Sequence, residues 1–204
     1  MIHENKQASK RVRWFVVVSP LALALAALSA QAAERVDLQK RDVAQLNRQY
    51  KSAVATTGAP TKANLRHAEL LSLDPESALL VLTSAQDADG THHYRYQQTF
   101  RGIPIFGEQV IVSEDGNGNV RNLFGRRVDG LAREVSATAP KVSKAQALAV
   151  AKRATLGTTL TSKVVKNEST QQMIYVDDNN VAHMSYVVNY FADAPKGGAP
   201  TRPF

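Results

Sequence analysis

One segment, from Tyr94 to Val112, constrains the possible folds of this 204-residue chain more than any other. In a strand, successive side chains point to opposite faces of the sheet, and up to Phe100 this alternation gives one mainly aromatic face and one polar face. The first holds Tyr94, Tyr96, Gln98 and Phe100, and the second holds Arg95, Gln97 and Thr99. Arg101-Gly102 interrupts the alternation, and a second strand-like run follows. The segment therefore predicts two β-strands joined by a break, and it holds no set of residues arranged for catalysis.

Strand and turn signals around this segment predict an antiparallel meander. Turn chemistry fills Gln86 to Gly90 and Glu114 to Asn119, where Asp-Gly and Asn-Gly pairs tolerate positive φ. Gly125 is a candidate bulge in the last strand. The predicted strands are 78–82, 92–100, 108–113 and 120–128.

Helical signals precede the meander. A polar stretch from Glu34 to Tyr50 has apolar residues at helical spacing, and the Thr56–Pro60 stretch breaks it. A second short helix is predicted from Leu65 to Leu73. It should end at Asp74-Pro75, because the residue before a proline avoids helical geometry.

A second α+β unit is predicted after a linker at 132–142. Ser143 and Gln146 fit a capping box, and the helix they open should end at Leu156, with Gly157 following it. Small residues form one face of this helix, which can sit close to a sheet: Ala147, Val150, Ala151 and Ala154. Strands are predicted at 162–165, 171–176 and 181–192, with a turn at 177–180. The fold class is therefore α+β, with two small units of antiparallel sheet and packed helices.

The first 32 residues have the pattern of a signal peptide. Basic residues precede an apolar run from Trp14 to Leu28, and Ala30-Gln31-Ala32 supplies small residues for cleavage between Ala32 and Ala33. The alternative is a membrane anchor, which needs roughly 20 apolar residues. Four basic residues and one acid lie in residues 1–32, so their removal lowers the formal net charge from +7 to +4.

Composition excludes several function classes. The chain has no cysteine, which excludes disulfides, thiolate metal sites, thiol nucleophiles and a lipoprotein anchor. The remaining basic residues are dispersed, so no nucleic-acid partner is predicted.

The sequence contains no recognisable catalytic or metal-binding pattern. His92 and His93 are adjacent on a strand and point to opposite faces, and no His-Glu-x-x-His pattern occurs. The aspartate-rich runs at 87–90 and 177–180 lack the glutamate that closes an EF-hand loop. We therefore predict no catalytic residue, no metal site and no cofactor in this chain.

The segment around Tyr94 resembles the fungalysin/thermolysin propeptide motif. In that family an aromatic-rich strand with a Tyr-x-Gln core runs into a Gly-(Ile/Val)-Pro-(Ile/Val) turn and a Gly-Glu pair. The matching residues are Tyr94, Tyr96, Gln97, Gly102, Pro104, Gly107 and Glu108. Residues 143–204 are similar to the PepSY module of such precursors, a cystatin-like fold, and Arg202-Pro203-Phe204 resembles the start of its next strand.

The resemblance implies the prepro region of a secreted bacterial zinc metalloprotease of the vibriolysin and pseudolysin type. The implied order is a signal peptide (1–32), a polar segment (33–64), a propeptide-type domain (65–131), a linker (132–142) and a PepSY-like domain (143–204). The last of these is expected to be truncated at its C-terminus. The protease domain itself is absent, so zinc and calcium are expected only there.

The resemblance also implies the partner and two roles. The chain would be an intramolecular chaperone and an inhibitor of a protease domain attached in cis, with no membrane contact after signal removal. The alternative is a stand-alone secreted inhibitor or binding module. The exposed candidates for contacting the protease are Arg95, Gln97, Arg101 and Glu108. Core positions are expected at Tyr94, Tyr96, Phe100 and Phe106, and turn positions at Gly102, Pro104 and Gly107.

Overall fold

The computed structural model describes residues 33–135, 139–158 and 163–193. The predicted signal peptide and the residues from 194 onward therefore lie outside the described part. The α+β prediction is confirmed, because helices pack on a seven-stranded sheet.

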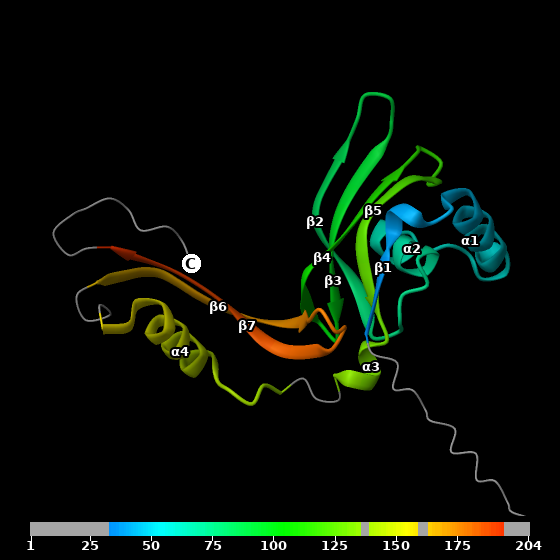
Figure 1. Ribbon diagram of the computed structural model, residues 1–204. Helices are drawn as coiled ribbons and strands as arrows, with labels where there is room; N and C mark the ends of the chain where they lie inside the picture. The colour runs from blue at the N-terminus through cyan, green and yellow to red at the C-terminus, as the bar shows by residue number, and fades with distance from the viewer. Residues whose placement is uncertain (1–32, 136–138, 159–162, 194–204) are drawn as a thin grey trace, which may run out of the picture.

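Five strands form the first part of the sheet, in the order β1-β5-β4-β3-β2, and all neighbours in it are antiparallel. Strand β6 joins this part through one parallel pair, Ile105 with Ile174, and pairs with β7 on its other side. The strands are β1 (Glu34–Asp37), β2 (Ser77–Gln86), β3 (His92–Phe100), β4 (Ile103–Glu114), β5 (Val120–Asp129), β6 (Val164–Val176) and β7 (Ala182–Asp193). We call β1 to β5 the meander and β6, β7 and the helix beside them the arm (Figure 1).

Three hairpins close with the same turn. Each turn begins with an aspartate whose backbone N–H donates to the carbonyl four residues on, and its fourth residue has positive φ. The aspartates are Asp87, Asp115 and Asp177, and the residues with positive φ are Gly90, Gly118 and Asn180. The three predicted turns are confirmed.

The predicted helix from Glu34 to Tyr50 is wrong in its first half. Residues 34–37 form β1 against β5, η1 (Leu38–Lys40) follows, and helix α1 is Val43–Thr57. Asp42 sets the start of α1, because its carboxylate accepts the Gln45 backbone N–H at 2.9 Å. Pairing with a distant strand therefore overrode local helical spacing, while the predicted break at 56–60 is confirmed.

Helices α1 and α2 (Ala63–Leu70) cover one face of the meander. Leu46 of α1 and Leu70 of α2 are buried with sheet residues such as Leu79, Tyr96 and Val110. Burial of this apolar area stabilises the meander by roughly 25 cal/mol per Å² removed from water.

The arm contains helix α4 (Lys144–Leu156), and its predicted bounds and capping box are confirmed. The predicted strands at 162–165 and 171–176 are one strand, β6, which has a bulge near Asn167, where φ is 52°. The predicted linker also needs correction, because Leu131–Glu134 forms the short helix α3. The small-residue face of α4 lines an open groove against β7, with Val150 64% exposed, while Leu156 is the buried helix residue.

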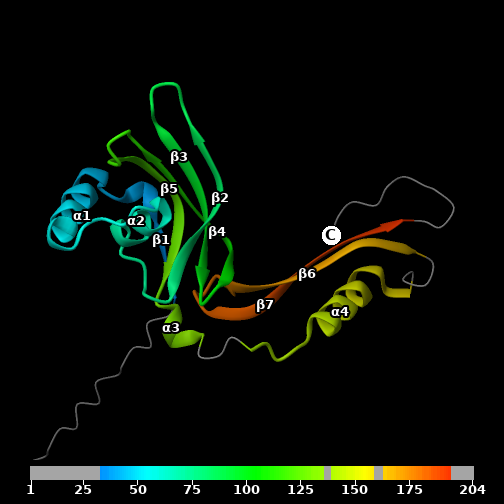
Figure 2. The same cartoon turned by 180° about the vertical axis from the view of Figure 1, so that it is seen from behind.

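A third cluster of apolar side chains joins the meander to the arm. Phe100 and Ile105 from the meander are buried with Ile174 and Val176 from β6 and with Leu131 from α3. In both views the arm leaves the lower end of the meander, with α4 beneath β6 and β7 (Figures 1 and 2). We call this junction the corner. The domain boundaries and the PepSY-like character of the second unit stay predictions.

Candidate functional site

The motif segment contains a wide bulge in β4. Strand β3 pairs Gln97 with Gln109 and Thr99 with Pro104, so residues 105–108 of β4 lie opposite Gln98 alone. Gly107 sits in this bulge with φ of 76°. Pro104 and Gly107 therefore lie within β4, and the predicted turn is confined to Arg101-Gly102, both with positive φ. The bulge carries β4 away from β3 and brings it to β6.

The side chain of Gln97 closes the bulge. Its Nε2 donates to the carbonyl oxygens of Gln98 at 3.0 Å, Ile105 at 2.6 Å and Glu108 at 3.0 Å. Carbonyls in a bulge lack their ladder partners, and buried carbonyls without partners are costly. Gln97 of the motif segment is thus explained by backbone groups that need a donor.

Gln98 performs the matching task on the other face. Its Oε1 accepts the Val128 N–H at 2.8 Å and its Nε2 donates to the Val128 carbonyl at 2.7 Å. The side chain is fully buried. Its two hydrogen bonds connect β3 to β5 at the level where β4 has left its place between them.

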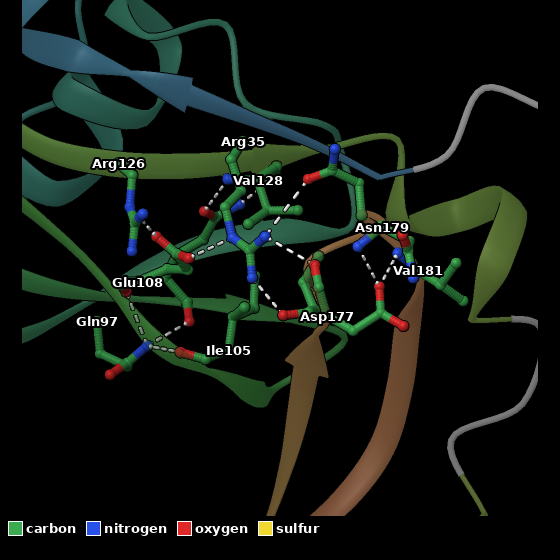
Figure 3. A network of polar contacts seen from close by, with 12 residues as sticks. Arg35, Gln97, Ile105, Glu108, Arg126, Val128, Asp177, Asn179 and Val181 are labelled. Atoms are coloured by element: carbon green, nitrogen blue, oxygen red, sulfur yellow. Dashed lines mark hydrogen bonds and ion pairs between the residues drawn. The ribbon is translucent and has the colours of Figure 1, made fainter.

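Arg35 connects β1, the bulge and the β6–β7 hairpin (Figure 3). Its Nε donates to Glu108 Oε1 at 2.8 Å, and its Nη1 donates to the Asp177 carbonyl at 2.9 Å. Its Nη2 donates to the Val176 carbonyl. One guanidinium therefore holds the arm to the meander at the corner.

Glu108 is the buried anion of this network. Its carboxylate is 2% exposed and accepts from Arg35 and, at 3.0 Å, from Nε of Arg126. The prediction that Glu108 is exposed is wrong, because the bulge turns its side chain toward these two cations. A carboxylate buried at this depth depends on its partners, since an uncompensated buried charge is strongly destabilising.

A second polar network lies between α2 and strands β3 and β4 of the meander. His67 Nε2 and Glu114 Oε2 are 2.9 Å apart, His67 Nδ1 and the Tyr96 hydroxyl are 2.7 Å apart, and Arg66 donates to both Glu114 oxygens. Burial lowers the pKa of His67 despite the nearby Glu114 carboxylate. Burial also raises the pKa of Tyr96. Burial would raise the pKa of Glu114, but hydrogen bonds and charge from Arg66 and His67 hold it below its usual value.

The other predicted contact residues lie apart from each other. Arg95 is exposed on β3, while Gln97 is half-buried and engaged in the bulge. Arg101 is exposed, pairs with Glu76 at 2.6 Å and donates to the Val135 carbonyl. Phe106 is 48% exposed rather than buried, because it alternates with the buried Ile105. Tyr96 and Phe100 are buried as predicted, and Tyr94 is partly buried.

Exposed apolar side chains alternate along the strands with buried ones in both the meander and the arm: Leu80 with Leu79, Phe124 with Leu123, Tyr175 with Ile174, and Phe191 with Tyr190. The Phe106 and Tyr175 rings, 6.3 Å apart, bring the two sets together at the corner. We call these exposed side chains the open face: Leu80, Phe106, Phe124, Tyr175 and Phe191.

Sequence reasoning missed Arg35 and the open face. Arg35 lies in a stretch that reads as a polar helix, and nothing local signals that its partners are 73 and more residues away. Among the described residues no group of acids and histidines could hold a metal ion. No helix in the described ranges is long and apolar enough to cross a membrane.

Comparisons with known proteins agree with the motif. A family model described as the fungalysin/thermolysin propeptide motif matches residues 77–126, which run from β2 into β5. The chain is 28% identical to the Neutral protease of Vibrio proteolyticus over 97% of its own length and 29% of that protein. It is 27% identical to the Virulence metalloprotease of Vibrio anguillarum, over 98% of this chain and 29% of that protein. It is 30% identical to a Bacillolysin of Bacillus subtilis (strain 168), over 71% of this chain and 28% of that protein.

Two facts follow from these matches. The chain spans less than a third of the length of these relatives, and the matched family is a propeptide family. The resemblance to the propeptide region of thermolysin-like protease precursors is therefore confirmed.

Proposed function

We propose that this chain, which carries the fungalysin/thermolysin propeptide motif, serves a zinc metalloprotease domain in cis as folding chaperone and inhibitor. The observation that carries the proposal is the match of residues 77–126 to a propeptide family, within an alignment that spans nearly the whole chain. Zinc would belong to the protease domain.

The open face is the proposed docking surface for that domain. Contiguous exposed apolar side chains are unusual on monomeric proteins and mark interaction sites. Leu80 and Phe124 lie on the meander, Tyr175 and Phe191 lie on the arm, and Phe106 lies at their join. Arg95 is exposed on the same side of β3 as Gln97 and would add a cation to this docking surface. Both residues are among the contact residues predicted from the motif.

The corner gives this surface a fixed shape. Arg35 and Glu108 hold meander and arm in one arrangement, which lowers the ordering cost of binding. A partner that binds only the folded protease stabilises it by mass action. Attachment in one chain raises the effective concentration to roughly the millimolar range.

Titration of the mature cognate protease with the purified chain tests the proposal. Slow, tight inhibition and faster recovery of activity on refolding are expected. Phe106→Asp combined with Tyr175→Asp should weaken inhibition about 30-fold, the effect of losing a hot spot of about 2 kcal/mol. Leu65→Asp is the matched control, because Leu65 is similarly exposed on α2. A chain that neither inhibits nor assists refolding overturns the proposal.

The coding sequence distinguishes the protease precursor from the alternative of a stand-alone inhibitor or binding module. A reading frame that continues past Phe204 into a His-Glu-x-x-His helix supports the precursor. We also propose export by the N-terminal segment, with cleavage between Ala32 and Ala33.

A further inference from the structure

The backbone nitrogen of Ala33 is held by a carboxylate. Ala33 is 1% exposed, and its N–H donates to Glu134 Oε1 at 2.9 Å. The other oxygen, Oε2, accepts the Ala182 N–H at 2.6 Å. Glu134 of α3 therefore joins the residue before β1 to the first residue of β7. We propose that Glu134 is a binding site for the free amino terminus exposed by cleavage after Ala32.

This inference rests on the proposed cleavage position. Hydrolysis places the hydroxyl of water on the Ala32 carbonyl carbon and its hydrogen on the Ala33 nitrogen. The new carboxyl group releases a proton and the new amine takes one, so Ala33 gains an ammonium with three donors. A neutral N–H then becomes one half of an ion pair at the same position, and charge-assisted hydrogen bonds are roughly twice as strong as neutral ones.

The surroundings of Ala33 favour a positive charge. The adjacent pocket is lined by Glu34 of β1, Asp74 and Glu76 before β2, and Asp129 of β5, while Arg133 of α3 is its cation. Glu76 is paired with Arg101 and Asp129 with Arg127. Carboxylates thus outnumber guanidinium groups around the nitrogen, and Glu134 is the one that contacts it.

The same contact links processing to the corner. Because Glu134 also holds Ala182, a stronger bond to Ala33 orders the carboxylate that fixes the start of β7. Cleavage is therefore expected to tighten the attachment of the arm, in addition to releasing the leader.

A double-mutant cycle tests the site with the processed chain, residues 33–204. One form begins at Ala33 and a second carries a single added glycine before it, each with Glu134 or with Glu134→Gln. At pH 7 the free terminus should lower the unfolding equilibrium constant about fivefold, as expected when a neutral hydrogen bond becomes charge-assisted. With Glu134→Gln that advantage should disappear.

The matched control is Glu34→Gln, which removes an exposed carboxylate from the same pocket. It should leave most of the advantage in place. An advantage that is absent with Glu134, or equal with and without it, overturns the proposal.

A pH series adds a readout that packing alone would not move. The free α-amino group ordinarily titrates near 7.7–8.0. Burial lowers the pKa of an amine and a carboxylate partner raises it, and the proposed site requires that the Glu134 contact outweigh burial in the folded state. The advantage should be complete below about pH 8 and lost as pH rises through the raised pKa. An advantage that persists unchanged well above that range overturns the proposal.

The amino-terminal mass of the exported chain tests the premise separately. Any start other than Ala33 removes the processing role. Neither measurement involves the protease, so failure here and failure of the proposed function remain distinguishable.

Discussion

The meander and the arm use the same arrangement of helix on antiparallel sheet, with different results. In the meander, α1 and α2 place large side chains such as Leu46 and Leu70 against the sheet, and the core is closed. In the arm, Ala147, Val150 and Ala151 of α4 line an open groove against β7. Within the described residues, the buried cluster beside this helix consists of Leu156, Tyr190 and Ala192. The arm therefore depends on the corner for its position, whereas the meander holds itself together.

Glu108→Ala should have the largest effect on the attachment of the arm to the meander. Removing a buried carboxylate leaves the Arg35 and Arg126 guanidinium groups without their shared partner, a loss of about 3–5 kcal/mol. Denaturant unfolding measures the cost, and amide exchange should accelerate more in β6 and β7 than in β3. Glu76→Ala, which removes a surface partner of Arg101, is the control and should change stability little. Equal acceleration in all strands would contradict a special role for the corner.

The same substitution at one glycine in the meander and one in the arm compares the stability of the two regions. Gly125→Ala in β5 puts a Cβ 2.0 Å from the Gln109 carbonyl oxygen at a φ of 86°. Overpacking and left-handed strain together predict a loss of about 3 kcal/mol. Gly157→Ala in the arm has open space around it, so only the backbone conformation, with φ of 52° and ψ of −129°, opposes the new Cβ, and about 2 kcal/mol is expected. Thermal unfolding of both variants checks the order, and similar losses would refute it.

Acidification should destabilise the meander through His67 and Glu114. Because the folded pKa of His67 lies below 6.5, the unfolded chain binds protons first, and stability falls as pH drops below about 6.5. The lowered pKa of Glu114 continues the loss as pH falls from 4.5 through its folded value.

Unfolding midpoints between pH 7 and 5 measure this slope. His67→Gln should flatten it, whereas His183→Gln, which alters the exposed histidine beside Asp177 in the arm, should leave it. A slope unchanged by His67→Gln would exclude this histidine as the source.

The smallest expected effect concerns the start of α4. Ser143→Ala removes the side-chain acceptor of the Gln146 N–H and should cost about 1 kcal/mol. Because α4 has few buried contacts, amide exchange should rise within α4 and not in α1. Asp42→Ala is the counterpart in the meander and should alter α1 instead.

Elements set by local interactions could be predicted from the sequence, whereas elements set by contacts between distant residues could not. Strand β3, helix α4 and the three aspartate turns were predicted at or near their bounds, because alternation, capping and positive φ are local. Strand β1 was not, since its partner β5 lies about 90 residues away and its own residues also suit a helix.

The motif residues show the same contrast between what local pattern predicts and what distant contacts decide. Its residues identified the family, yet they suggested that Glu108 is exposed and Phe106 buried. A bulge of four residues opposite one reverses which side chains face inward, and its width depends on β6 being available as a partner.

The sequence by itself determined the fold class, the propeptide relationship and the absence of cysteine chemistry, because these rest on composition, local pattern and motif. The tertiary structure alone decided that Arg35, Glu108 and Glu134 hold the corner. Their partners are 18 to 145 residues distant, and such charges take positions that only the completed backbone defines.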